Sequence, residues 1–309
     1  MIYDVGDIQD LFSKDDIVIG KMDNYFSRVG DIKNIRSDTL DWVNIANPNP
    51  IKYIVRSTSR FMICPKINEL DIPPDVLKRK TLILTQNPNL LFARVARKIF
   101  SPEQQYGIHQ TTIIHSDAVI NQNIFIGPYT YIGKAIIETG TVINGNCFID
   151  NDVSIGKNSL IKAGARLGQS GFGFVRNEEG EFEEFPQLGN LVIGDNVEIG
   201  SNTCIDRGSL STTLIESGVK INSNCHIAHN SKIGRNSFIG SNVTISGSVI
   251  IGQGCWIAPS VTIRDHLIIG DYCIIGIGSV VTKSIPDNEV WYGVPAKYIR
   301  DQGKLAKRK

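Results

Sequence analysis

Isoleucine and other apolar residues recur at every sixth position over most of the chain from residue 108 onward. Glycine or alanine often follows the isoleucine, and a small residue often stands two places before it, as in SFIGSN and VEIGSN. This hexapeptide pattern predicts a parallel β-helix, a solenoid in which each apolar side chain stacks on the one in the coil below. The longest unbroken run is Ile215, Ile221, Ile227, Ile233, Ile239, Ile245, Ile251, Ile257, Ile263, Ile269 and Ile275.

Such hexapeptides resemble those of the left-handed β-helix family, which implies triangular coils of three hexads each. Residues 1–105 lack the period; there TLILT at 81–85 predicts a strand, and NLLFARVARKIF at 89–100 has the spacing of an amphipathic helix. We therefore expect a mainly β protein. A small α/β domain precedes a β-helix over residues 106–285, and a short C-terminal extension follows at 286–309.

Two insertions interrupt the repeat. The larger, at 168–192, contains GQSGFGFVRNEEGEFEEFPQLGN, and the smaller, RGSLSTTL, precedes Ile215. A coil accommodates an insertion only as an outward loop, and long loops on rigid scaffolds often carry function. GFGF lacks the GxGxxG spacing and the following helix of a dinucleotide motif. We interpret the larger insertion as a functional flap, with Phe172 and Phe174 as candidate substrate contacts.

Histidines interrupt the repeat at CHIAHNSKIG. His229 comes two positions after Ile227, where its side chain should leave the core. Gly247 follows His229 by three hexads, and His266 follows it by six hexads and one further position, so these three candidate catalytic residues would lie along one groove. A neutral imidazole can accept a proton, and the glycine offers a backbone N–H. Surface or intersubunit histidines are the alternative interpretation.

Metal binding is a third use for these histidines. His226, His229 and His266 could nominally hold zinc, as in hexapeptide carbonic anhydrases, but their expected directions differ. The six cysteines include no CxxC pair. We predict no metal site, and we expect small buried thiols at Cys147, Cys225, Cys255 and Cys273.

Composition narrows the range of partners. With 32 basic and 31 acidic residues the net charge is +1, which gives no electrostatic reason to expect nucleic acid or an anionic membrane. The first residues, MIYDVGDIQD, lack the features of a secretion signal, and no apolar run could span a bilayer. We expect a cytoplasmic protein without membrane insertion.

The stretch LDWVNIANPNPIKYI combines aromatic and amide side chains with turn-forming prolines. Trp42, Asn47, Asn49 and Tyr53 could hold a nucleobase. Core aromatics and ordinary turn residues would give the same pattern.

Several longer motifs occur in order: NPNLLFARVARKIF, GIHQTTIIHSDAVI, GFGF, FPQLGN, IDRGSL, IAHNSKIG and DHLIIG. Over residues 35–285 the chain resembles the UDP-3-O-acylglucosamine N-acyltransferases of the lipid A pathway. The resemblance implies that His229 is a general base, that the Gly247 N–H stabilises an oxyanion and that His266 is a second active-site histidine. It also implies a nucleotide-binding N-terminal domain and a homotrimer with active sites between subunits.

Two features depart from that family. The ending GVPAK resembles that of hexapeptide acetyltransferases that use coenzyme A, so we expect acyl-CoA as a cosubstrate and no permanently bound cofactor. Lys297 and Arg300 could then meet the CoA phosphates, although a solvated basic tail is the alternative. Asn222 stands where relatives often carry aspartate.

The expected activity is N-acyl transfer from acyl-CoA to the amine of a UDP- or dTDP-linked amino sugar, for surface polysaccharide or glycan biosynthesis. The first alternative is the lipid A reaction itself, with a hydroxyacyl chain delivered by acyl carrier protein. The second is a noncatalytic solenoid that binds nucleotide sugars.

Overall fold

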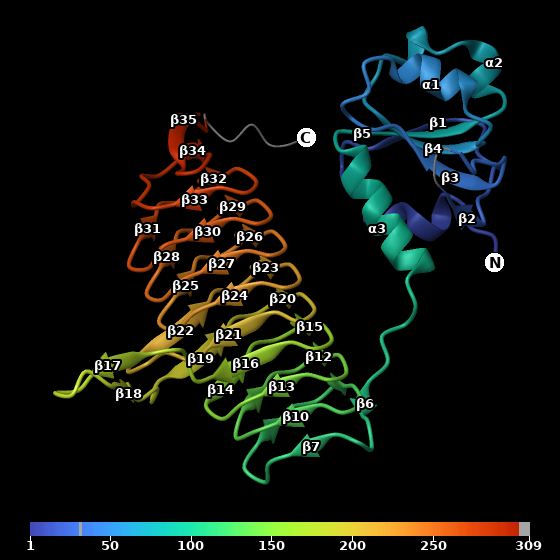
Figure 1. Ribbon diagram of the computed structural model, residues 1–309. Helices are drawn as coiled ribbons and strands as arrows, with labels where there is room; N and C mark the ends of the chain where they lie inside the picture. Colours follow the sequence, from blue (N-terminus) through green and yellow to red (C-terminus); the bar gives the residue numbers. More distant parts are fainter. Residues whose placement is uncertain (31–32, 303–309) are drawn as a thin grey trace. The chain divides into compact units, whose positions relative to one another are not determined.

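The computed structural model describes residues 1–30 and 33–302, which divide into two compact units, before and after the Gln104–Gln105 bond. Figure 1 shows the N-terminal unit as a sheet with helices and the second unit as a stack of coils. Within the described ranges, no helix is both long enough and apolar enough to cross a membrane.

The N-terminal unit is built on a five-stranded sheet of order β1-β5-β4-β3-β2, in which only β1 runs antiparallel to its neighbour. Phe61 and Ile63 of β4 face α3, whereas Met62 and Cys64 face α1 and α2, so both faces of the sheet are covered. The elements are η1 (Gly6–Leu11), β1 (Ile17–Gly20), β2 (Arg28–Val29), β3 (Thr39–Trp42), α1 (Pro50–Arg56), β4 (Phe61–Pro65), η2 (Glu69–Asp71), α2 (Pro74–Leu77), β5 (Thr81–Thr85) and α3 (Pro88–Phe100).

The strand and helix predicted in this unit are confirmed as β5 and α3. The side chain of Asn87 accepts a hydrogen bond from Leu90 N at 3.1 Å, and Pro88 occupies the first helical turn. The helix ends at Phe100 because Ser101 precedes a proline and is held extended.

The second unit is a parallel β-helix in which successive short strands belong to three different sheets. Ile227 pairs with Ile245 and Ile245 with Ile263, so positions three hexads apart are neighbours. Asparagines such as Asn224 and Asn242 occupy left-handed corner positions, which asparagine tolerates better than most residues.

The strands of this unit are as follows. The first sheet contains β6 (Gly107–Ile108), β9 (Phe125–Ile126), β12 (Val142–Ile143), β15 (Leu160–Ile161), β20 (Glu198–Ile199), β23 (Lys220–Ile221), β26 (Phe238–Ile239), β29 (Trp256–Ile257), β32 (Ile274–Ile275), β34 (Glu289–Tyr292) and β35 (Lys297–Asp301). The second contains β7 (Ile113–Ile114), β10 (Tyr131–Ile132), β13 (Phe148–Ile149), β16 (Arg166–Gln169), β21 (Cys204–Asp206), β24 (His226–Ile227), β27 (Thr244–Ile245), β30 (Thr262–Ile263) and β33 (Val280–Val281). The third contains β8 (Val119–Ile120), β11 (Ile136–Ile137), β14 (Val153–Ile155), β19 (Asn190–Ile193), β22 (Thr212–Ile215), β25 (Lys232–Ile233), β28 (Ile250–Ile251) and β31 (Ile268–Ile269).

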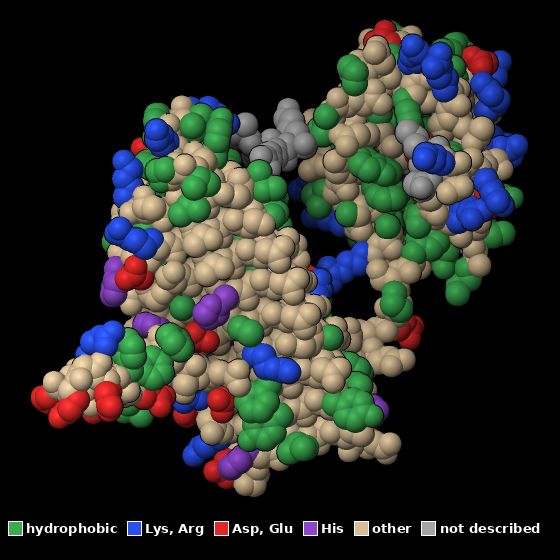
Figure 2. All heavy atoms as spheres, viewed as in Figure 1, with side chains coloured by type: hydrophobic (Ala, Val, Ile, Leu, Met, Phe, Trp, Pro, Cys, Tyr) green, Lys and Arg blue, Asp and Glu red, His purple; other side chains and the backbone are tan. Residues whose placement is uncertain are grey.

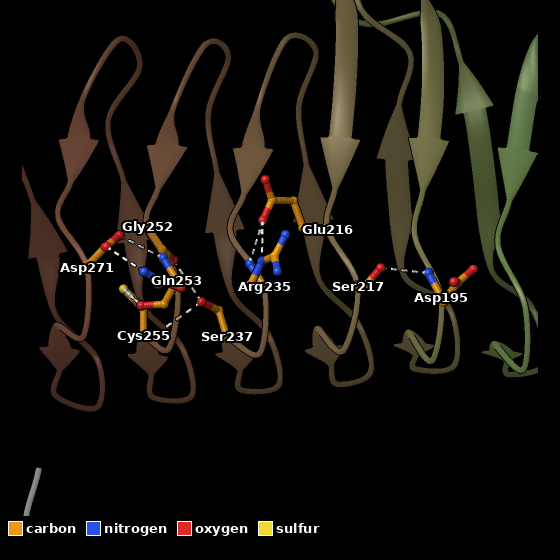
Figure 3. Close-up of polar contacts among 9 residues, drawn as sticks. All are labelled: Asp195, Glu216, Ser217, Arg235, Ser237, Gly252, Gln253, Cys255 and Asp271. Carbon is orange, nitrogen blue, oxygen red and sulfur yellow. Dashed lines mark hydrogen bonds and ion pairs between the residues drawn. The ribbon is translucent and has the colours of Figure 1, made fainter.

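Stacked isoleucines fill the interior of the coils, and each fully buried side chain contributes roughly 1.5–3 kcal/mol to stability. The predicted burial of Cys147, Cys225, Cys255 and Cys273 is confirmed, and all four are free thiols. Polar contacts tie neighbouring coils together at the corners, as Figure 3 shows for Gln253, whose backbone N–H donates to Asp271 Oδ1 at 3.0 Å. The scaffold is therefore held along its whole length.

The larger insertion forms a two-stranded hairpin, β17 (Phe174–Arg176) and β18 (Phe182–Glu184), that projects from the coils in Figure 1. Its returning stem meets the smaller insertion, since Gly189 N donates to the Gly208 carbonyl at 3.0 Å. The two interruptions of the repeat thus meet on one side of the solenoid.

Candidate active site around His229

His229 lies at the corner between β24 and β25, two positions after the buried Ile227. Gly247 lies in the next coil beside its imidazole: a Cβ placed on Gly247 would be 2.7 Å from Cε1 and 2.9 Å from Nε2 of His229. The Gly247 N–H forms no hydrogen bond to any residue that the structure describes. The backbone of Gly247, whose N–H has no acceptor in the described chain, therefore packs directly against the imidazole.

The flap, which is the larger insertion, approaches the imidazole of His229 through Gly171. A Cβ on Gly171 would lie 3.0 Å from Cδ2 of His229 and 3.3 Å from Oε1 of Gln187. Gln187 is buried, and its Nε2 donates to the Phe185 carbonyl at 3.0 Å, which fixes the orientation of the amide. Its Oε1 has no hydrogen-bond partner in the described chain. The first glycine of GFGF thus makes room for the ring, a role that the sequence did not reveal.

Asn230 links His229 to the smaller insertion by hydrogen bonds, and it was not predicted as a site residue from the sequence. Oδ1 of Asn230 accepts hydrogen bonds from Ser209 N at 2.9 Å and Ser211 Oγ at 3.1 Å. Its Nδ2 donates to Ser209 Oγ at 2.8 Å and lies 3.3 Å from Nδ1 of His229. The IAHN stretch could have indicated this role, because an asparagine at a left-handed corner directly after a histidine lies within reach of the imidazole.

This network bears on the tautomer of His229. The backbone N–H of Ser209 can only donate, so Oδ1 of Asn230 must face it and the amide NH₂ must face Nδ1. The neutral imidazole then has its lone pair on Nδ1 and its proton on Nε2. For Nε2 to accept a proton, the ring must adopt the other tautomer and give up the long 3.3 Å contact with Asn230.

His266 lies one position further round the corner than Gly247. Its backbone N–H donates to the Gly247 carbonyl at 3.0 Å, just as Ser248 N donates to the His229 carbonyl at 2.9 Å. Position 265, one full coil after Gly247, holds an aspartate. The side chain of His266 is 76% exposed, and its Nε2 lies 3.9 Å from Asp265 Oδ2. Gly247 therefore contacts the His229 ring directly, whereas the side chain of His266 lies on the exposed surface of the corner.

His226 has a different partner. Its Nε2 lies 3.2 Å from Asp206 Oδ2, and this hydrogen bond raises the pKa of His226 despite partial burial. Among the described residues, no group of three or more His, Cys, Asp or Glu side chains is placed to hold a metal ion.

A cavity of about 490 Å³ in the N-terminal unit contains three of the four predicted base-binding residues, Asn47, Asn49 and Tyr53. The hydroxyl of Tyr53 donates to Oδ1 of the buried Asp41 at 3.2 Å, and burial together with this carboxylate raises the pKa of Tyr53 to about 12. Basic residues also line this cavity: Lys33, Lys52 and Arg56.

Trp42 does not line that cavity. Its ring stacks on Phe92 of α3 at a centroid distance of 5.4 Å, in the core on the α3 side of the sheet. Tyr53 packs with the core on the side of α1 and α2. Trp42 therefore stabilises the helix packing and is separated by the sheet from Tyr53.

The other predicted contacts lie on exposed segments. Phe172 and Phe174 form an edge-to-face pair at 4.8 Å on the flap, 87% and 44% exposed. Lys297 and Arg300 lie on the exposed strand β35, where Arg300 Nη1 donates to the Asp301 carbonyl at 2.9 Å. Residues 303–309 of the C-terminal extension lie outside the described part of the chain.

Comparison with known proteins agrees with the repeat and the fold. The family model described as bacterial transferase hexapeptide (six repeats) matches residues 212–247 and 248–283, and the one described as hexapeptide repeat of succinyl-transferase matches 232–263. UDP-N-acetylglucosamine acyltransferase from Campylobacter jejuni superimposes with a TM-score of 0.58 at 24% identity, covering 63% of this chain and 75% of that one. LpxA from Acinetobacter baumannii gives 0.56 at 28% identity, covering 63% and 74%. The solenoid is a left-handed parallel β-helix, which confirms the predicted fold class.

Curated relatives of this chain carry the name UDP-3-O-acylglucosamine N-acyltransferase. The protein from Pseudomonas syringae pv. tomato is 35% identical over 210 residues, which are 60% of this chain and 56% of that protein. The protein from Polynucleobacter asymbioticus is 30% identical over 240 residues, which are 69% of this chain and 67% of that protein. The match thus spans between about half and two thirds of these relatives. With its hexapeptide repeats, its β-helix and this similarity, the chain belongs to the hexapeptide-repeat family of the UDP-3-O-acylglucosamine N-acyltransferases.

Proposed function

We propose that this protein is an N-acyltransferase that moves an acyl group from a thioester to the amine of a nucleotide-linked amino sugar. The observation that carries the proposal is the close packing of Gly247, whose N–H has no acceptor in the described chain, against the imidazole of His229. Amide formation from a thioester needs a proton acceptor for the amine and a donor for the developing oxyanion. These two groups supply both requirements in one place.

The proposed step balances on these residues. The amine nitrogen attacks the thioester carbonyl and forms the C–N bond, while Nε2 of His229, in its Nδ1–H tautomer, takes the proton from the amine. The tetrahedral oxygen accepts a hydrogen bond from Gly247 N–H. When the C–S bond breaks, the imidazolium returns its proton to the leaving thiolate. General-base help of this kind is worth about 10²- to 10⁴-fold in rate.

The names of the relatives favour a UDP-linked 3-O-acylglucosamine as the acceptor, and with it the lipid A type of reaction rather than an acyl-CoA-dependent polysaccharide reaction. We infer a hydroxyacyl chain on acyl carrier protein as the preferred donor. Acyl-CoA is the second candidate, because the GVPAK ending resembles that of CoA-dependent enzymes. The proposed assembly is a cytoplasmic homotrimer.

The test is release of free thiol, followed colorimetrically, with UDP- and dTDP-linked amino sugars as acceptors. Each acceptor is offered with hydroxyacyl-acyl carrier protein, acetyl-CoA or 3-hydroxybutyryl-CoA. Fast release that requires one sugar and the carrier-protein donor would support the proposal. Release with CoA thioesters alone would move the donor to CoA, and no release from any pair would favour a noncatalytic sugar-binding solenoid.

A further inference from the structure

The N-terminal unit has a second cavity, lined mainly by basic and small polar residues. Its volume is about 540 Å³, and no aspartate or glutamate occurs among its described lining residues. Figure 2 shows Lys and Arg side chains gathered on one side of this unit. We call this cavity the basic cleft; its six basic residues are Lys21, Arg56, Arg60, Lys78, Arg79 and Lys80.

Much of this charge is not neutralised by the protein. Lys21 lies 3.4 Å from Asp23, and Arg79 pairs with Asp75 at 2.8 Å on an exposed surface. Within the described residues, Arg56, Arg60 and Lys78 form no ion pair with a carboxylate. The chain as a whole has a net charge of only +1, so the lining of the cleft is far more basic than the chain overall. Such a concave positive site favours a multiply charged anion.

A buried ammonium group supports one wall of the basic cleft. Lys80 is 3% exposed, and its Nζ donates to the carbonyls of Ser57 and Ser59 at 2.5 Å each. These bonds fix the backbone that joins α1 to β4. Burial, and after it the neighbouring Arg79, lowers the pKa of Lys80 to about 8. The wall is thus built around a charge that no described carboxylate pairs.

The basic cleft adjoins the cavity that contains Asn47, Asn49 and Tyr53. Arg56, Ser57 and Thr58, at the end of α1, line both cavities. Their wall is held from within, because Ser57 Oγ donates to Asp41 Oδ2 at 2.6 Å and Asp41 also accepts from Tyr53. A ligand with an aromatic base in one cavity can therefore place an anionic group against Arg56.

We propose that the basic cleft binds the diphosphate group of a substrate, with Arg56, Arg60 and Lys78 as its main cationic contacts. Guanidinium groups match phosphate oxygens in a two-pronged geometry, and a lysine adds a point charge. Two substrates considered above carry a diphosphate: the nucleotide sugar and coenzyme A. The choice between these sources rests on the proposed function, whereas diphosphate binding by the cleft does not.

The test is calorimetric titration of the full-length chain with inorganic pyrophosphate, UDP, uridine and CoA. We expect pyrophosphate to bind the unmodified protein, and Arg60→Gln and Lys78→Gln each to weaken that binding about tenfold. Lys66→Gln is the matched control, because Lys66 is an exposed lysine of the same unit outside the cleft, and it should leave binding unchanged. Circular dichroism checks that each variant is folded.

The UDP and CoA titrations identify the source of the diphosphate. If Arg60→Gln and Lys78→Gln weaken the binding of UDP but not of CoA or uridine, the cleft binds the nucleotide sugar. If they weaken the binding of CoA alone, the cleft binds the acyl donor. Either result supports the proposal. Pyrophosphate that fails to bind, or that binds both variants as tightly as the unmodified protein, overturns it. Because thiol release is measured separately, a failure of the proposed acyl transfer would not be mistaken for a failure of the cleft.

Discussion

Gly247 lies so close to His229 that any side chain at position 247 would meet the imidazole. A Cβ built there falls 2.7 Å from Cε1, nearer than the 3.0 Å below which real Cβ contacts essentially never occur. On this side the imidazole therefore packs against the Gly247 backbone, which leaves no room for a side chain.

Gly247→Ala should reduce kcat at least about tenfold, because the added methyl displaces the imidazole and narrows the approach to the N–H. The measurement is thiol release under saturating substrate, with circular dichroism to confirm the β-helix. Ser246→Ala in the same corner is the control and should keep nearly full activity. Normal turnover of Gly247→Ala would show that this close packing is not needed for turnover.

His229→Ala should lower kcat about 100-fold or more, since it removes the proposed proton acceptor. The oligomeric state should not change, because His229 leaves the core and its coil is held by Ile227. Light scattering after size-exclusion chromatography checks the assembly, and thiol release checks the rate. Near-normal turnover with an intact assembly would remove His229 as the base.

The solenoid could be predicted from the sequence because one physical requirement repeats: an inward residue at every sixth position. Ile227, Ile245 and Ile263 show the three-hexad coil directly in their register. The N-terminal sheet was less visible, since strands such as β2 are very short. Only β5 and α3 were predicted; β4 (FMICP) is similarly apolar, but a short apolar run alone does not distinguish a strand from a buried helix segment.

The site was predictable only where it follows the repeat. Counting by whole coils placed Gly247 beside His229, but His266 comes one position later than a whole coil after Gly247 and therefore stands one corner position away. Gly171 and Gln187 come from an insertion without periodicity, so nothing in the spacing brings them to the ring. For the same reason, composition could not show that Trp42 packs on α3 and away from Tyr53.

Asn230→Asp should move the acid limb of the pH dependence of kcat/KM to higher pH by about one unit. A carboxylate in place of the amide would accept a hydrogen bond from Nδ1–H, which favours both the Nε2-base tautomer and the protonated ring. The added negative charge stabilises the imidazolium, so the rate would reach its plateau only at higher pH. Ser209 N and Ser211 Oγ can still donate to the new carboxylate.

Asn230→Ala is the comparison for that experiment, because it removes the amide without adding charge. Asn230→Ala should lower kcat, because the imidazole of His229 loses its amide contact and is less well oriented. The acid limb of the pH profile should not move to higher pH. An unchanged pH profile in Asn230→Asp would mean that the group titrating in the rate is not His229.

The side chains of His226 and Asp206 form a hydrogen-bonded pair. The hydrogen bond to Asp206 raises the folded-state pKa of His226 above its unfolded value near 6.5. The resulting stabilisation is fully present below about pH 6.5 and is lost as the pH rises through the folded-state pKa. His226→Gln should therefore cost more stability at pH 5.5 than at pH 8.5. The difference is below about 1 kcal/mol, because the imidazole is half exposed and solvent screens the pair.

Differential scanning fluorimetry at the two pH values measures this difference as a gap in Tm between the unmodified chain and His226→Gln, about 1–3 °C wider at the lower pH. His109→Gln is the control, because the ring of His109 meets the Thr111 hydroxyl at 2.9 Å rather than a carboxylate. The difference in Tm between the unmodified chain and His109→Gln should not widen at the lower pH. An equal gap for His226→Gln at both pH values would mean that the pair does not stabilise the fold through the charge of His226.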